Sequence, residues 1–171
     1  MKTKTINIYS FNELSEKAKD KARNWWRDCG AGDEWYECTL EDAVTIGVRI
    51  TGFDTGRGQD ISGEFMLSPN EVAQNIFNNH GETCDTFKTA AAFMAEWQPV
   101  FDAYMDEESE RYETREAEEE LMELESEFLH DILEDYLSML RKEEEWYFSD
   151  EQVDEAITCN EYEFTEDGGI A

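Results

Sequence analysis

The sequence contains no long apolar run and has few positive charges. A membrane-spanning helix needs roughly 20 consecutive apolar residues, and no segment of the 171-residue chain approaches that length. Only 14 Lys and Arg stand against 43 Asp and Glu, which gives a formal net charge of -29. Because phosphates attract cations, this balance disfavours direct binding to nucleic acid or to an anionic membrane. We therefore predict a protein that neither crosses a membrane nor binds nucleic acid directly.

Closely spaced cysteine pairs are also missing. The four cysteines are scattered, with no C-x-x-C pair among Cys29, Cys38, Cys84 and Cys159. The opening residues, MKTKTINIYS, lack the apolar core of a secretory signal peptide. Such thiols are expected to stay reduced. We predict a cytoplasmic protein, located in the cytosol.

Residue patterns for catalysis or metal binding are sparse. Glu127 and His130 form a single E-x-x-H pair, whereas a di-iron carboxylate site needs a second copy. His80 and Cys84 lie on either side of a helix-breaking glycine, so they do not predict a zinc site. The loop at 54–60 has a G-x-G fragment but lacks the lysine of a P-loop. The sequence predicts no enzyme, no metal and no cofactor.

Apolar residues are nevertheless abundant enough for a folded core. Hydrophobic residues make up 40% of the chain and aromatic residues 13%, which is too much apolar surface for a disordered acidic tail. A chain of 171 residues is long enough for one ordinary domain and short for two. We predict a single domain over residues 1–171.

Residue periodicity predicts a mostly helical α+β fold. Serine caps, helical spacing and terminating glycines place a helix at about 11–30, with a capping box at Ser10 and Glu13 and a second start at Ser15, and further helices at about 35–46, 69–81 and 86–97. A last short helix is capped by Ser149. Alternation places strands at about 5–9, 48–53 and 61–67, of which the second and third form a hairpin. A final strand at 158–165 is compatible with joining that hairpin as a third strand. The expected sheet is small and antiparallel.

Glycine and proline are absent between Pro99 and Gly168. Pro99 is expected to stop the helix before it, and residues 105–146 then favour one long acidic helix of about 60 Å. Since a compact domain of this size has a radius of gyration of only about 15 Å, we expect the first part of this helix to project. The part from about Leu121 is expected to pack through an apolar stripe: Ala117, Leu121, Leu124, Phe128, Ile132, Tyr136 and Leu140.

Acidic residues on the same segment also recur every three or four positions. They are expected to line one helical face, opposite much of the apolar stripe: Glu113, Glu116, Glu120, Glu123, Glu127, Asp131 and Glu134. From Asp106 to Glu145 there are 18 acids and 4 bases. This is about one acid per 3.3 Å of helix, close to the ~3.4 Å phosphate spacing along one DNA strand. These seven acids are the predicted partner-binding residues.

Positive charge is concentrated at the start of the chain. Residues 1–30 hold seven Lys or Arg against four acids. Five of these bases fall on the first predicted helix: Lys17, Lys19, Lys21, Arg23 and Arg27. We expect this helix to pair with the long acidic helix of the same chain or of a second copy.

Four stretches of the sequence together resemble a known family. These are YSFNELSEKAKDKARNWW, GFDTGRG with the GEF that follows it, HGETCDTFKTAAAF and NEYEFTEDG. They resemble an uncharacterised family of acidic bacteriophage and prophage proteins that are sometimes labelled antitoxin-like. The resemblance covers most of the chain and implies a binding or neutralising role.

Charge and resemblance together give a leading hypothesis and several alternatives. The leading hypothesis is a phage-encoded inhibitor that mimics DNA and occupies the basic surface of a host nuclease or defence complex. The alternatives are an antitoxin that folds against one basic toxin, and a structural or assembly protein. An enzyme would need a carboxylate cluster with raised pKa values in a pocket.

Overall fold

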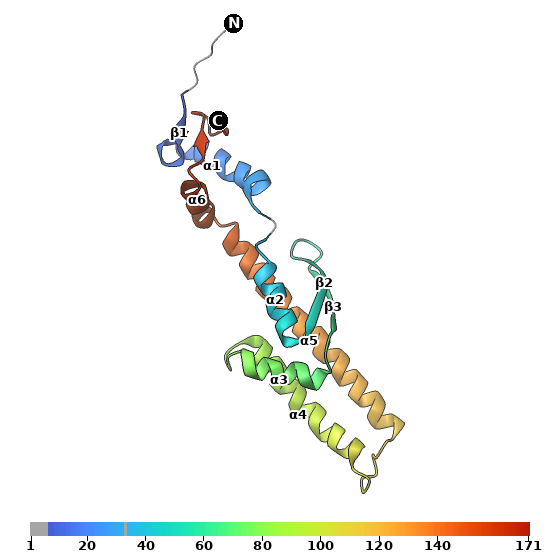
Figure 1. The fold of residues 1–171 in the computed structure, drawn as a ribbon. Coiled ribbons are helices and arrows are strands. Elements are labelled where there is room, and N and C mark those ends of the chain that lie inside the picture. Colours follow the sequence, from blue (N-terminus) through green and yellow to red (C-terminus); the bar gives the residue numbers. More distant parts are fainter. Residues whose placement is uncertain (1–6, 33) are drawn as a thin grey trace. The chain divides into compact units, whose positions relative to one another are not determined.

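A computed structural model describes residues 7–32 and 34–171 (Figure 1). In these residues the chain is mostly helical, and its helices, hairpin and second small sheet confirm the predicted α+β class. The helices are α1 (Glu16–Trp25), α2 (Glu37–Ile46), α3 (Pro69–Asn79), α4 (Asp85–Met105), α5 (Arg115–Tyr147) and α6 (Asp150–Cys159). The strands are β1 (Tyr9–Ser10), β2 (Val48–Asp54), β3 (Asp60–Phe65) and β4 (Glu163–Phe164). None of the helices so described has both the length and the apolar character needed to cross a membrane.

The chain divides into two compact units. The terminal unit contains Met1–Trp35 and Lys142–Ala171, and the central unit contains Tyr36–Arg141. The prediction of a single domain over residues 1–171 stays a prediction, because compactness alone does not say whether the two units fold independently.

Helix starts follow the serine caps that the sequence predicts. The Ser68 hydroxyl accepts a hydrogen bond from the Glu71 backbone amide at 3.4 Å, and the Glu71 carboxylate accepts one from the Ser68 amide at 3.0 Å. This reciprocal box begins α3, with Pro69 at its first position. Single serine caps begin α1 at Ser15 and α6 at Ser149. Local sequence therefore fixes these boundaries.

The core of the central unit combines α2 to α5 with the β2–β3 hairpin. The Phe93 ring of α4 and the Phe128 ring of α5 stack with centroids 4.1 Å apart and planes within 4°. Six of the seven predicted stripe residues on α5 are buried, and Leu124 is half-buried. Leu133 and Leu137 join the buried face as well. The predicted stripe is confirmed and is wider than expected.

Helix boundaries around Pro99 differ from the prediction. Pro99 lies inside α4, which continues to Met105, and α5 begins only at Arg115. A proline inside a helix costs about 3 kcal/mol. Burial of Trp97 before it and Val100 after it offsets that cost. The expected helix start at residue 105 was wrong because residues 106–114 instead form turns.

The beginning of α5 packs instead of projecting. Helices α4 and α5 run antiparallel, side by side in Figure 1, so that Trp97 Nε1 donates to Glu125 at 3.0 Å and Thr89 Oγ1 donates to Asp135 at 2.7 Å. Ala117, in the first turn of α5, is already fully buried. The turn at 106–114 folds the acidic segment back onto its predecessor, which the absence of glycine and proline did not indicate.

In the terminal unit, residues from both ends of the chain form a second apolar core. Its buried residues come from residues 11–26, from α6 and from β4. They are Phe11, Leu14, Ala18, Ala22, Trp26, Val153, Ile157 and Phe164. Strand β4 pairs antiparallel with β1, so the β2–β3 hairpin gains no third strand from it. The ring of the fully buried Phe164 lies 6.3 Å from Phe11 and 6.0 Å from Trp25, and these contacts fix β4 in this core.

Gly168 is a position where a side chain is not tolerated. Its φ is +81°, and a Cβ atom there would lie 2.1 Å from the Ala18 carbonyl oxygen. We expect Gly168→Ala to lower the free energy of unfolding by about 2–4 kcal/mol, because backbone strain and a backbone clash add. Urea unfolding followed by circular dichroism measures the change. Gly81→Ala is the matched control, since a Cβ there meets nothing within 4 Å; equal losses in both variants would contradict this account.

Candidate functional site

Helix α5 carries a dense run of acids within the central unit. Residues 116–135 include ten Asp and Glu, about one per 3 Å of helix. No Lys or Arg occurs between Arg115 and Arg141. Because the opposite face is buried, these acids are held on an ordered scaffold and not on a flexible tail.

Five of the seven predicted binding residues lie on one exposed face of α5. We call these the α5 carboxylate face: Glu116, Glu123, Glu127, Asp131 and Glu134. Across residues 7–32 and 34–171, no ion pair involves any of the five. Their negative charge is therefore not compensated by an ion pair within the described residues.

The other two predicted residues play different parts. Glu113 lies before α5 in a turn with φ of +47°, where its amide donates to the Tyr104 carbonyl at 3.1 Å. Its predicted place on the helical face was wrong, because the helix starts two residues later. Glu120 is on α5 but forms an ion pair with Arg111 of the preceding turn. That pair neutralises much of its charge and fixes the turn against the helix.

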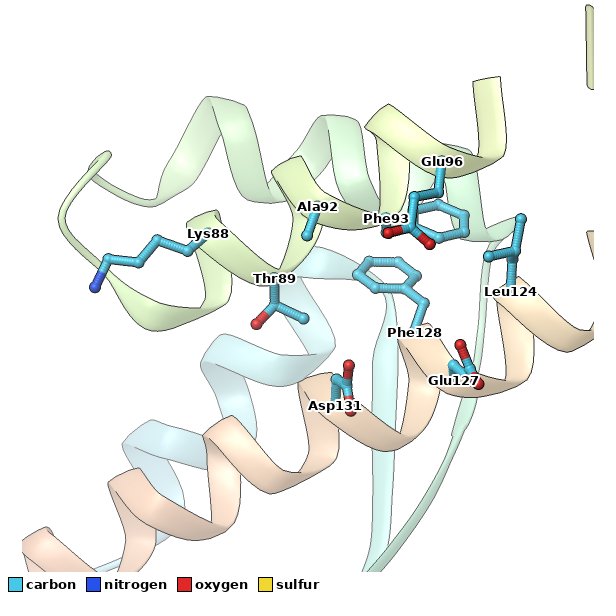
Figure 2. A pocket seen from close by; sticks show the side chains of 9 residues that line it. All are labelled: Lys88, Thr89, Ala92, Phe93, Glu96, Leu124, Glu127, Phe128 and Asp131. Atoms are coloured by element: carbon cyan, nitrogen blue, oxygen red, sulfur yellow. The ribbon is translucent and has the colours of Figure 1, made fainter. Parts of the chain in front are cut away.

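A cavity of about 400 Å³ lies between α4 and α5 beside this face. Its lining comes from both helices: Lys88, Thr89, Ala92, Phe93, Glu96, Leu124, Glu127, Phe128 and Asp131. Figure 2 shows the stacked phenyl rings between the helices, with three carboxylates around them and Lys88 extending away. The structure thus brings two residues of the α5 carboxylate face together with an aromatic floor, a combination that the sequence did not predict.

Charge around this cavity is mainly negative. Lys88 forms an ion pair with Asp85 at 2.8 Å, and hydrogen bonding to Asp85 raises the pKa of Lys88. Glu96 of α4 faces the same cavity as Glu127 and Asp131 of α5. A long cationic side chain matches such a site, because its aliphatic part packs on aromatic rings while its charge reaches carboxylates.

Asp135 lies one turn beyond Asp131 and does not line the cavity. Partial burial raises its pKa above the ordinary 3.8, against the opposing effect of the hydrogen bond from Thr89; Asp85 and Asp131 raise it further. The raised pKa thus comes from packing of α5 against α4.

Sequence reasoning missed a buried polar network in the central unit. The Tyr136 hydroxyl donates to Asp42 Oδ2 at 2.7 Å, and burial raises the Tyr136 pKa strongly. His80 Nδ1 lies 2.7 Å from Thr86 Oγ1, while its Nε2 is 3.3 Å from Asp42 Oδ2 without an aligned hydrogen bond. These residues are far apart in the sequence, so spacing gave no signal. His80 thus serves the packing of α2, α3 and α4.

Metal-ligand clusters were sought over the described ranges, 7–32 and 34–171. No group of three or more His, Cys, Asp or Glu side chains there is arranged to hold a metal ion. The four cysteines are exposed and unbonded to one another.

The basic helix α1 pairs within the terminal unit and not with the α5 carboxylate face. Arg23 forms two hydrogen bonds to Asp154 of α6, at 2.6 and 2.8 Å. Lys21 pairs with Asp167 at 2.7 Å and holds the pKa of that carboxyl at about 2. The predicted pairing with the long acidic helix of the same chain was therefore wrong for these bases, and pairing with the helix of a second copy stays a prediction. Their charges are compensated close to the terminal core.

Comparisons with protein-family models, with curated proteins and with solved structures give no match to this chain.

The raised pKa of Asp135 predicts a pH-dependent stability effect. Ionised Asp135 destabilises the fold at neutral pH, and this penalty disappears below the ordinary pKa of 3.8, where folded and unfolded chains are both protonated. We expect Asp135→Asn, which keeps an acceptor for Thr89, to raise the unfolding temperature at pH 7 but not near pH 3.5. Thermal unfolding at several pH values tests this. An equal rise in the unfolding temperature at both pH values would contradict a raised pKa of Asp135 as its cause.

Proposed function

We propose that this protein is an acidic binding protein whose α5 carboxylate face occupies the basic, nucleic-acid-binding surface of another protein. A phage-encoded inhibitor of a host nuclease or defence complex would act in this way. The observation that carries the proposal is the set of five exposed carboxylates without ion-pair partners on one packed helix. A DNA mimic requires negative charge in a fixed arrangement, and a packed helix supplies it.

Spacing on the helix supports the comparison with a DNA strand. Glu116 and Glu134 are 18 residues apart, which corresponds to about 27 Å along α5. Five carboxylates over this length give about one per 5–7 Å, and the full set of ten acids gives about one per 3 Å. Along one strand of DNA the phosphates are about 3.4 Å apart. The helix therefore approaches the charge density of a DNA strand only when all its acids are counted.

Total charge supports a cationic partner as well. A net charge of -29 far exceeds the magnitude of about 2 to 8 that keeps a small domain soluble. Self-repulsion at this charge destabilises a compact fold. Counterions released from both surfaces on binding favour association at low salt. A binding role gives this excess charge a use that solubility alone does not.

An antitoxin-like role against one basic toxin is the second candidate. Two methionines on the α4–α5 hairpin favour it, because Met105 is 57% and Met122 65% exposed. Exposed apolar side chains suit a clamp with an apolar interface. Such a complex depends less on salt than a DNA mimic bound mainly through charge.

The main test compares two variants with equal net charge. The first neutralises the α5 carboxylate face as Glu116→Gln, Glu123→Gln, Glu127→Gln, Asp131→Asn and Glu134→Gln. The matched control neutralises five exposed acids outside α5, as Glu41→Gln, Asp60→Asn, Glu82→Gln, Glu107→Gln and Glu110→Gln. Five charges are removed from -29 in each case, so both variants carry -24.

The unmodified chain and both variants are used to capture proteins from a bacterial lysate at about 50 mM and about 200 mM salt. Each captured protein is then challenged with a 20-base-pair DNA duplex. We expect the α5 variant to lose at least about tenfold in affinity and the control less than about threefold, with the duplex displacing the partner.

Other results assign the function differently. Equal capture by both variants would contradict the role of the α5 carboxylate face. A single small basic protein that is held at the higher salt and resists the duplex would favour the antitoxin-like role.

A further inference from the structure

A second aromatic cavity lies in the terminal unit. It has a volume of about 430 Å³, and four aromatic side chains line it: Trp26, Trp146, Tyr147 and Tyr162. These residues come from the segment after α1, from the last turn of α5 and from the segment after α6. Neither the sequence patterns nor the proposed function gives this cavity a role.

Trp146 is the unusual residue of the cavity. Its side chain is 59% exposed, whereas Trp26 in the same cavity is only 5% exposed and belongs to the core. The Tyr147 ring lies 5.6 Å from that of Trp26, so the inner wall is fixed by ring packing. A large exposed tryptophan beside a cavity is typical of a surface that a partner covers.

The polar residues of the lining indicate the chemistry of the occupant. Glu155 contributes an exposed carboxylate, and Gln152 and Asn160 contribute side-chain amides. Asn160 Nδ2 already donates to the Ala156 carbonyl at 2.8 Å, so its Oδ1 is left as an acceptor. No Lys or Arg lines the cavity. Acceptors and one negative charge next to aromatic faces suit a cation that also donates hydrogen bonds.

We propose that this cavity binds an arginine side chain of a basic partner protein. The planar guanidinium stacks on the exposed indole of Trp146 and donates to the Glu155 carboxylate and to the amide oxygens. Lysine is a poorer match, because its ammonium is more strongly hydrated and does not stack. A quaternary ammonium has no hydrogen to donate.

Charge favours an arginine within a polypeptide over free arginine. Residues 142–171, which supply most of the lining, carry one lysine and eleven acids. A basic polypeptide brings further positive charges to this acidic surface, whereas free arginine carries a single net positive charge because its α-ammonium and α-carboxylate cancel. This site is in a different unit from the α5 carboxylate face and does not depend on the function proposed for that face.

Nuclear magnetic resonance of the full ¹⁵N-labelled chain tests the site directly. The probe is N-acetylarginine methylamide at about 150 mM salt, which screens distant charges. We expect saturable shifts of the Trp146 indole signal and of the Gln152 and Asn160 side-chain amides, with a dissociation constant on the order of 1–10 mM. The citrulline analogue has the same shape without the charge, so it is expected to produce no saturable shift.

Variants separate the site from general attraction to an acidic protein. Glu155→Gln is expected to raise the dissociation constant of the arginine probe at least about threefold. Trp146→Ala is expected to abolish saturable binding of the probe. Glu151→Gln removes the same charge from another exposed position of α6 that does not line the cavity, and it is expected to leave binding unchanged. Retention of the other amide signals shows that the variants are folded.

The following results would overturn the proposal. Saturable binding of the citrulline analogue would show that the cation is not recognised. Equal binding of the lysine analogue would remove the preference for arginine, and tighter binding of free arginine would remove the preference for a peptide. Shifts that are confined to the α5 carboxylate face, or binding that Glu151→Gln weakens as much as Glu155→Gln does, would indicate charge attraction without a site.

Discussion

Packing of the apolar stripe of α5 is the interaction on which the rest of the central unit depends. Burial of one large apolar side chain contributes roughly 1.5–3 kcal/mol, and eight residues of α5 are buried. Like charges four residues apart in a helix cost only about 0.2–0.5 kcal/mol per pair. Packing therefore outweighs the repulsion among the carboxylates. The stack of Phe93 on Phe128 then joins α4 to the buried face of the same helix.

The middle of α5 stays negative because the few bases of the chain form ion pairs elsewhere. Arg111 and Arg115 pair with Glu120 and Glu119 near the start of the helix. Arg23 and Lys21 of α1 form ion pairs with acids of the terminal unit. The middle of α5 contains no base in its own sequence, so repulsion among its exposed acids is relieved mainly by solvent and counterions, with Lys88 of α4 acting on Asp135. The location of the exposed charge follows from where the bases are paired as much as from where the acids are.

Local signals in the sequence predicted the fold class well, and long-range contacts explain most of what was missed. Serine caps and the four-residue step of the α5 stripe are properties of neighbouring residues, so they could be recognised. The continuation of α4 through Pro99 depends on burial of Trp97 and Val100 in a core built by other elements. The exposed acidic face of α5 was predicted except at Glu113 and Glu120, because composition gives no sign of a turn that contains neither glycine nor proline. The aromatic floor beside that face combines Phe128 of α5 with Phe93 of α4, and the acidic pattern of α5 gives no sign of the contribution from α4.

In the proposed binding of a basic partner, the acids and the aromatic rings of this chain would contribute differently. Exposed charges are screened beyond about 8–10 Å at physiological salt, yet a net charge of -29 still speeds the approach of any basic protein. Attraction of this kind does not distinguish one cation from another. Discrimination requires groups that touch the partner, and under the two proposals the cavities would provide them, because each places phenyl, indole or phenol rings next to carboxylates. Since aromatic contacts are insensitive to salt, selectivity in this protein is expected to come from its few accessible rings and association rate from its many acids.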